Sequence, residues 1–283
     1  RSSDLVKCVL YTGLKGLHKD FFMIIDEKRQ KILEEVLSTP TAPFHEENMI
    51  SYIKNFAKEH NLSIEEDNYG NLVIKYSTDT TLPILCFHAH TDHPGFEVKE
   101  IKDGYAVLEP LGGVPNLFPG DKVIAFSKSK QIPMEVVENI SLLSDKNPDL
   151  TFKPCLLVKG SELPQIGDYA VLDMAGYRNE NGKIHSRATD DLAGCAALLV
   201  LLKTIISKNV KANIYSVFTR AEEVGFVGAY GLVKSGIIPK DTVTICLESS
   251  KATYNSKQGE GPVIRLGDRS SLFDPKVTIF LLT

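Results

Sequence analysis

The sequence lacks several features that would assign it to particular classes of protein. Its formal net charge of −4 leaves no basic excess, so the composition gives no support for nucleic-acid binding. No apolar run reaches the roughly 18 residues that a membrane-spanning helix needs. The partly apolar start, residues 5–25, is interrupted by Lys7, Lys15 and Asp20 and so lacks the continuous core of a signal peptide. No internal repeat or low-complexity tract is visible.

Cysteine is scarce, and its distribution argues against a disulfide framework. The five cysteines are scattered and odd in number: Cys8, Cys86, Cys155, Cys195 and Cys246. Cys86 and Cys246 lie in apolar, strand-like runs, where a reduced buried thiol is expected. We therefore predict a cytoplasmic protein without disulfides.

What the sequence does contain is an alternation of helix and strand patterns on either side of a different middle segment. The 283 residues, 43% hydrophobic and 24% charged, suit one large globular domain or two modest ones. Apolar spacing predicts helices at 26–38, 45–60, 190–209 and 226–236, and strands at 69–76, 82–88, 213–219 and 243–249. This alternation predicts an α/β domain with a mostly parallel central sheet covered by helices. Residues 278–283 have the pattern of a further strand.

The middle of the chain has the pattern of an all-β module. Short apolar runs at 105–110, 122–126, 134–140, 155–160 and 169–173 are separated by turns rich in glycine and proline. Short strands at regular spacing indicate a small barrel or sandwich. We therefore predict a discontinuous catalytic α/β domain, residues 1–96 and 176–283, with an inserted β-barrel domain at 97–175.

Candidate functional residues fall at or near the ends of predicted strands in the α/β part. They are His90 and Asp92, Asp190 and Asp191, Glu222 and Glu223, and Glu248. Ligand sites of open α/β sheets lie beyond the carboxyl ends of the strands, so these distant residues can meet in one pocket.

Taken singly, each of these groups has a simpler explanation. The segment "HAHTDH" could be a polar loop, although a carboxylate two residues after a histidine can also orient a metal-bound imidazole. Asp190 and Asp191 stand where aspartate commonly caps a helix. Glu222 and Glu223 could be a solvated pair at a turn, or one could bind a metal while the other takes a proton from water. Glu248 could be an ordinary charge at a strand end.

The order of the motifs is much rarer than any one of them. "HTD", "TDD", "AEEVG" and "LES" follow one another as in the M42 family of co-catalytic metallo-aminopeptidases, the glutamyl and tetrahedral aminopeptidases, which this chain resembles. The resemblance runs from about residue 27 to the end and includes "GEGPVIRLGDRSSLFDP". Related deacylases and carboxypeptidases insert their second domain after the glutamate pair, whereas here about 100 residues separate His90 from Asp190.

The resemblance implies a fold, a site and an activity. The fold would be a three-layer, zinc-exopeptidase-like domain with an inserted oligomerisation barrel, assembled into homo-oligomers that are often dodecamers. His90, Asp190 and Glu248 would bind one divalent metal ion, and Asp190 would bridge to a second ion that Glu223 also binds. Asp92 would orient His90, and Glu222 would be the general base in hydrolysis of a peptide substrate. Oxygen and imidazole ligands suit zinc, cobalt or manganese.

Two departures from the family pattern affect these expectations. The family usually has aspartate at the position of Glu248, and it takes its last metal ligand from a histidine near its C-terminal end. No histidine follows His185 here, which suggests a truncated chain or a variant with an incomplete second site. Metal should then bind more tightly at the His90 site than at the Glu223 site. The rival hypotheses are a metal-dependent deacylase or other amidohydrolase, and a non-catalytic assembly subunit.

Overall fold

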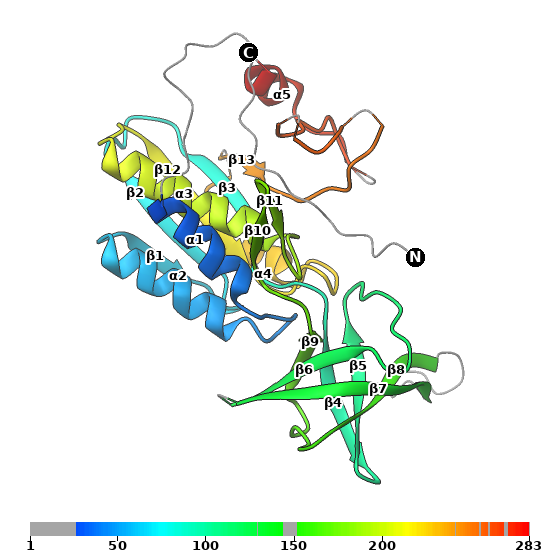
Figure 1. Ribbon diagram of the computed structural model, residues 1–283. Helices are drawn as coiled ribbons and strands as arrows, with labels where there is room; N and C mark the ends of the chain where they lie inside the picture. Colours follow the sequence, from blue (N-terminus) through cyan, green and yellow to red (C-terminus); the bar gives the residue numbers. More distant parts are fainter. Residues whose placement is uncertain are drawn as a thin grey trace.

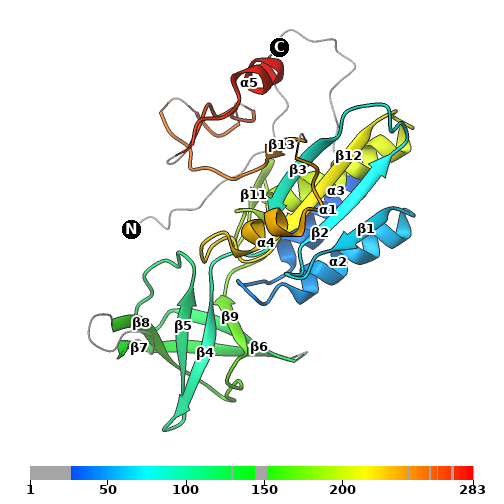
Figure 2. The same ribbon diagram turned by 180° about the vertical axis from the view of Figure 1, so that it is seen from behind.

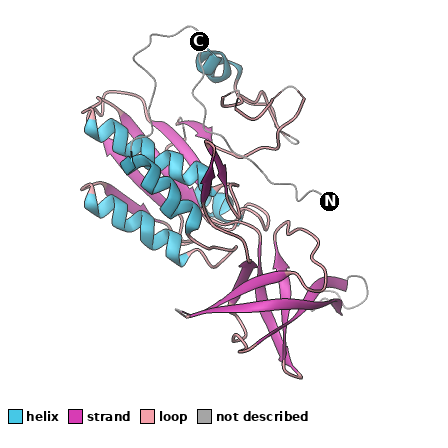
Figure 3. Ribbon diagram, viewed as in Figure 1, coloured by secondary structure: helices cyan, strands magenta, loops and turns pink. Residues whose placement is uncertain are grey.

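The computed structural model describes residues 27–128, 130–143, 152–240, 242–254, 256–259, 261–268 and 271–282. Expectations about residues 1–25, including Cys8, lie outside these described residues. Figure 1 shows an α/β part and a separate β-barrel, joined where the chain leaves and re-enters the α/β part. In Figure 3 the barrel consists of strands and loops, whereas the helices gather around the other sheet and near the C-terminus.

The central sheet has five strands in the order β1-β2-β12-β3-β13. They are β1 (Ser63–Glu66), β2 (Leu72–Ser77), β12 (Asn213–Thr219), β3 (Leu85–His90) and β13 (Val243–Cys246). Strand β3 runs parallel to both β12 and β13, while β2 pairs antiparallel with β12 and with β1. The predicted α/β class with a mostly parallel core is confirmed, and the antiparallel strands lie on one side of it.

Helices cover the two faces of this sheet. The helices are α1 (Glu27–Ser38), α2 (Glu47–Glu59), α3 (Leu192–Ser207), α4 (Val227–Ser235) and α5 (Pro275–Leu282). Helices α1, α2 and α3 bury their apolar residues in the main core with β2 and β12, and α4 packs on the opposite face, as the two views in Figures 1 and 2 show. Helix α3 is apolar nearly all round because it lies inside the domain, and its Leu199 and Leu202 are fully buried.

The inserted module is a closed barrel in the order β4-β5-β8-β7-β6-β9. Its strands are β4 (Gly95–Lys102), β5 (Tyr105–Leu111), β6 (Lys122–Ser127), β7 (Lys130–Leu143), β8 (Phe152–Gly160) and β9 (Tyr169–Leu172). Closure by pairing of β4 with β9 leaves no open sheet edge. Strand β4 has no counterpart among the predicted strands, because the charged side chains of Glu97, Lys99, Glu100 and Lys102 obscure its alternation. A separate hairpin, β10 (Arg178–Glu180) and β11 (Lys183–His185), follows the barrel.

Two local expectations were wrong. Residues 278–282, expected as strand, belong to helix α5 because Asp274 caps it: Asp274 Oδ1 accepts the N–H groups of Lys276 and Val277 at 2.8 and 3.0 Å. Proline at the first helical position favours the same outcome. Cys246, expected as buried, is exposed since β13 is the edge strand of the sheet, whereas Cys86 is buried as expected. No helix in the described part of the chain has the length and apolar character needed to cross a bilayer.

Candidate metal centre

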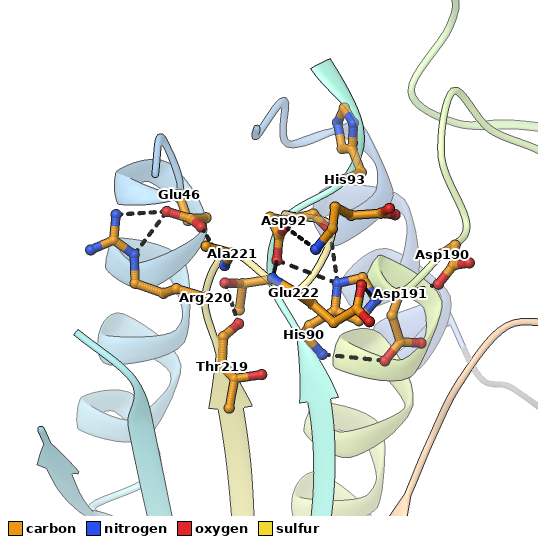
Figure 4. A network of polar contacts seen from close by, with 12 residues as sticks. Glu46, His90, Asp92, His93, Asp190, Asp191, Thr219, Arg220, Ala221 and Glu222 are labelled. Atoms are coloured by element: carbon orange, nitrogen blue, oxygen red, sulfur yellow. Dashed lines mark hydrogen bonds and ion pairs between the residues drawn. The ribbon is translucent and has the colours of Figure 1, made fainter. Parts of the chain in front are cut away.

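The candidate residues gather where the parallel strands end. His90 is the last residue of β3, and Glu222 and Glu223 lie in the turn that follows β12. Glu248 comes two residues after β13, and Asp190 lies just before α3. Since β12, β3 and β13 are parallel neighbours, their carboxyl ends share one edge of the sheet and bring these side chains together. Figure 4 shows His90, Asp190 and Glu222 of this cluster.

The imidazole of His90 is at the centre of this cluster. Its Nε2 atom lies 3.4 Å from Asp190 Oδ1, 3.9 Å from Glu222 Oε2 and 4.0 Å from Glu248 Oε1. Two groups have ligand atoms all within 4.8 Å of one another: His90 with Asp190 and Glu248, and His90 with Glu222 and Glu223. The structure therefore brings together the five side chains that were predicted to bind metal or act as the base.

Asp92 orients the ring mainly through its backbone. His90 Nδ1 donates to the carbonyl oxygen of Asp92 at 3.0 Å, while the Asp92 carboxylate oxygen Oδ1 is 3.4 Å away. This bond leaves Nε2 facing the other carboxylates, the arrangement of a metal-ligating histidine. The buried Asp92 carboxylate accepts the backbone N–H groups of Glu222 and Glu223 at 2.9 and 3.1 Å. Asp92 therefore joins the end of β3 to the glutamate turn, a second task that the sequence did not reveal.

The two aspartates before α3 face different partners. Asp191 is buried and its Oδ2 accepts the backbone N–H of His90 at 3.3 Å, so it supports the end of β3 from the side of α3. Asp190 Oδ1 is buried and makes no hydrogen bond, although it faces His90 Nε2. A buried carboxylate oxygen without a donor is the feature expected of a group that takes a cation.

Mutual repulsion and burial perturb the acids of the cluster. Burial raises the pKa of Glu223 to about 7, with Asp190 adding to the effect. Burial and the neighbouring Asp190 carboxylate raise the pKa of Glu248 to about 9. Burial opposes the charged form of His90, but the neighbouring carboxylates of Asp190 and Asp92 outweigh it and raise its pKa to about 12. In the metal-free protein, bound protons thus neutralise part of the negative charge of the crowded carboxylates. A divalent cation would neutralise the same charge. The donor set fits zinc, cobalt or manganese.

The inserted barrel also touches the glutamate turn. Gly112, just after β5, has a φ of 84°, and a Cβ atom there would lie 2.9 Å from Glu223 Cβ. Leu111 belongs to a small apolar cluster against which Val224 packs. A larger residue at position 112 would therefore press on the backbone and side chain of Glu223.

Three histidines occupy residues 88–93, and only His90 faces the carboxylates. His88 Nε2 pairs with the hydroxyl of Thr219 at 2.8 Å, within the sheet. His93 is buried; its Nδ1 donates to the Pro94 carbonyl at 2.9 Å and its Nε2 accepts the N–H of Thr41 at 3.4 Å. Burial lowers the pKa of His93 to about 4, so it stays neutral and anchors the loop before α2.

A Gly194→Ala change in α3 should disturb the site through Asp191. A Cβ atom on Gly194 would lie 2.3 Å from Asp191 Oδ1, so the carboxylate that holds the His90 backbone must move. Overpacking of this kind costs about 1–3 kcal/mol. We expect a lower melting temperature and weaker cobalt binding at the His90 group, measured by thermal denaturation and by titration. The control is Gly113→Ala, where nothing lies within 4 Å of the added Cβ; an equal effect of both changes would contradict the explanation.

A three-layer α/β domain with an imidazole and carboxylates gathered at its carboxyl edge defines the class of metal-dependent hydrolases. The sequence model of the M42 glutamyl aminopeptidase family matches residues 161–283. The glutamyl aminopeptidase of Lactococcus lactis is 28% identical over 252 residues, which are 82% of this chain and 70% of that protein. The putative aminopeptidase YhfE of Bacillus subtilis is 25% identical, over 76% of this chain and 66% of that protein.

Solved structures agree with this assignment at the level of the fold. A TET aminopeptidase from a marine-sediment Thaumarchaeota archaeon superposes with a TM-score of 0.77 at 18% identity, covering 90% of this chain and 78% of that one. The TET1 peptidase of Pyrococcus horikoshii superposes with a TM-score of 0.72 at 23% identity, covering 90% and 80%. Residues 161–283 therefore match the M42 glutamyl aminopeptidase family in sequence, and the chain as a whole shares the fold of the TET aminopeptidases.

Proposed function

We propose that this chain removes N-terminal residues from peptides, and that the cluster around His90 is its catalytic centre. The observation that carries the proposal is the convergence of three other segments on His90 Nε2, together with a buried Asp190 oxygen that has no hydrogen-bond donor. His90, Asp190 and Glu248 would hold one divalent ion. Asp190 and Glu223 would hold a second.

Glu222 is the proposed general base. Its Oε2 atom lies beside the His90 group, and burial raises the pKa of its carboxyl above the ordinary value, which favours proton transfer near neutral pH. When bound, the cations would lower the pKa of the attacking water and polarise the scissile carbonyl. Glu222 would take the proton of that water and pass it to the leaving amine. The surrounding carboxylates would hold the ammonium group of a free substrate N-terminus, which favours exopeptidase action.

The two proposed cation sites differ in the number of ligand side chains. The first has one imidazole and two carboxylates, all brought together in the structure. The second would draw on the Asp190 and Glu223 carboxylates, without an imidazole of its own, since His90 is assigned to the first site. We therefore expect the His90 group to bind a divalent ion more tightly than the Glu223 side of the cluster.

Residues 97–175 are the proposed oligomerisation domain. Among the structural neighbours, PhTET1-12s is described as a dodecamer, and the Pyrococcus horikoshii TET1 peptidase as assembling into a tetrahedron or a large octahedral shell. The closed barrel projects away from the α/β domain, which leaves its outer surface open to partner subunits (Figure 1). A homo-oligomer built through this barrel is the assembly we propose.

Matched peptides test the proposed activity. The protein is assayed with cobalt or zinc on short peptides whose N-terminus is either free or acetylated, and on N-acyl amino acids. We expect metal-dependent release of free amino acids from the unblocked peptides alone. Release from N-acyl amino acids would instead indicate a deacylase, and no hydrolysis of any of these substrates would favour a non-catalytic subunit.

A further inference from the structure

Glu46 is a fully buried carboxylate that none of the sequence motifs includes. It lies directly before α2, and both of its oxygens are occupied. Oε1 accepts the N–H groups of Phe44 at 3.1 Å and Ala221 at 2.9 Å. Oε2 accepts from Arg220, at 2.8 Å from Nε and 2.6 Å from the terminal nitrogen Nη2 (Figure 4). The side chain thus connects the start of α2 to the residues just before the proposed base.

Three consecutive backbone N–H groups of the glutamate turn are bound by two buried carboxylates. Ala221 donates to Glu46, and Glu222 and Glu223 donate to Asp92. Ala221 is buried and has a φ of 50°, a left-handed conformation that a residue with a Cβ seldom adopts without support. Glu46 accepts the N–H of this residue, which lies immediately before Glu222.

The far side of the same turn is closed by other contacts. The N–H of Arg220 donates to Asn71 Oδ1 at 3.0 Å, and the N–H of Gly228 donates to the Arg220 carbonyl at 2.9 Å. A Cβ atom on Gly228 would lie 2.3 Å from that carbonyl oxygen, so the two ends of the turn are in close contact. The Ala221 carbonyl accepts the N–H of Val227 at 3.1 Å, so the part of the Ala221 backbone that depends on Glu46 is its N–H group.

We propose that Glu46, neutralised by Arg220, is a positioning residue that sets the backbone of Ala221 and thereby aims Glu222 and Glu223 at the His90 group. The inference rests on the proposed function for its kinetic consequence. Without the acceptor on Glu46, Ala221 can relax to a right-handed conformation, which turns the following peptide and redirects both glutamates. The residue itself touches neither substrate nor cation.

Two substitutions of Glu46 separate hydrogen bonding from charge. Glu46→Met removes the acceptor for Ala221, whereas Glu46→Gln keeps one carbonyl oxygen for that bond and loses only the ion pair with Arg220. For Glu46→Met we expect kcat to fall about 10–100-fold, the usual effect of losing a supporting partner of a metal site, with KM changed less than about twofold. Glu46→Gln should retain most of the wild-type kcat.

Hydrogen exchange supplies a readout that does not depend on activity. In the wild-type protein the amides of residues 221–223 should exchange slowly, and Glu46→Met should accelerate their exchange while Glu46→Gln does not. Cobalt affinity of the His90–Asp190–Glu248 group should stay within about twofold of the wild-type value in both variants. If Glu46→Met does not fold, Glu46→Gln and Arg220→Gln test the inference in its place. Both variants keep the hydrogen bond between Glu46 and the N–H of Ala221, so kcat should stay near the wild-type value in both.

A destabilised control excludes a general loss of stability as the cause. Ile53→Ala shortens a fully buried apolar side chain of α2, which forms none of the hydrogen bonds of the turn. It should lower the melting temperature and leave kcat and the exchange of residues 221–223 unchanged. An equal loss of kcat in Ile53→Ala, or wild-type kcat and exchange in Glu46→Met, would overturn the inference. A wild-type protein that hydrolyses no peptide refutes the proposed function alone, since hydrogen exchange still decides whether Glu46 sets the turn.

Discussion

A Glu222→Gln variant is expected to hydrolyse peptides about 10²–10⁴-fold more slowly than the wild-type protein, the range typical of a missing general base. The amide has nearly the same size and can keep the backbone bond from Glu222 to Asp92. It cannot accept a proton from water at neutral pH, so the chemical step fails while the cluster stays assembled. The loss should appear in kcat, measured on unblocked peptides at saturating cobalt or zinc.

The metal content of this variant separates the base from the ligands. Because Glu222 is not among the proposed ligands of either ion, cobalt binding to the His90 group should persist. The control is Glu34→Gln on the exposed side of α1, which makes the same chemical change far from the cluster and should leave kcat unaltered. Undiminished hydrolysis by Glu222→Gln would show that the activity arises elsewhere than at this cluster.

The general location of the site was predictable because residues that follow neighbouring parallel strands lie close together at one edge of the sheet. The run before His90 is apolar enough to be a central strand, and the run before Glu222 has the same character. The run before Glu248 is apolar too, although its strand β13 lies exposed at the edge of the sheet. Strands of this kind become parallel neighbours whose carboxyl ends share one edge. His90 and the acids of three other segments could therefore be expected to meet.

The supporting contacts could not be predicted, since they depend on distances between segments far apart in the sequence. Glu46 lies 175 residues from Ala221, whose N–H it accepts, and its sequence context is that of an ordinary helix start. Asp92 was expected to orient His90 through its carboxylate, which instead accepts two amides of the glutamate turn. His93 lies in the same histidine-rich segment as His90, yet its two ring nitrogens bond to backbone groups. Only packing distinguishes these roles.

The metal-free protein is expected to lose stability as the pH rises from about 7 to 9, because three groups of the cluster have raised pKa values. At lower pH the buried His88 and His93, whose pKa values burial lowers to about 4, oppose this trend. The pKa of Glu223 is raised to about 7, that of Glu248 to about 9 and that of His90 to about 12. Over this window the folded state therefore binds more protons than the unfolded chain. Stability must then fall with rising pH, since its slope follows the protons bound by the unfolded state minus those bound by the folded state.

A bound cation should remove most of this dependence. It would take the place of the protons, so binding should release them, which calorimetry in buffers of different ionisation enthalpy can measure. At 100 times the dissociation constant, a ligand specific for the folded state adds about 2.7 kcal/mol to the free energy of unfolding. We expect the melting temperature of the wild-type protein to rise accordingly with zinc or cobalt, most strongly at the alkaline end of the window.

Asp190→Asn should abolish that metal effect and flatten the pH dependence together. Asp190 is the proposed ligand common to both ions, so its loss removes the stabilisation by zinc. The same carboxylate raises the pKa values of Glu223, Glu248 and His90, so its loss brings all three closer to their ordinary values. The metal-free variant should therefore lose less stability than the wild type between about pH 7 and 9. Asp103→Asn, at an exposed turn of the barrel, is the matched control. If Asp190→Asn keeps the wild-type response to both zinc and pH, the cluster around His90 is not a cation site. Asp190 is the proposed ligand of both ions and also raises the pKa values of the neighbouring groups, so its loss should change both responses.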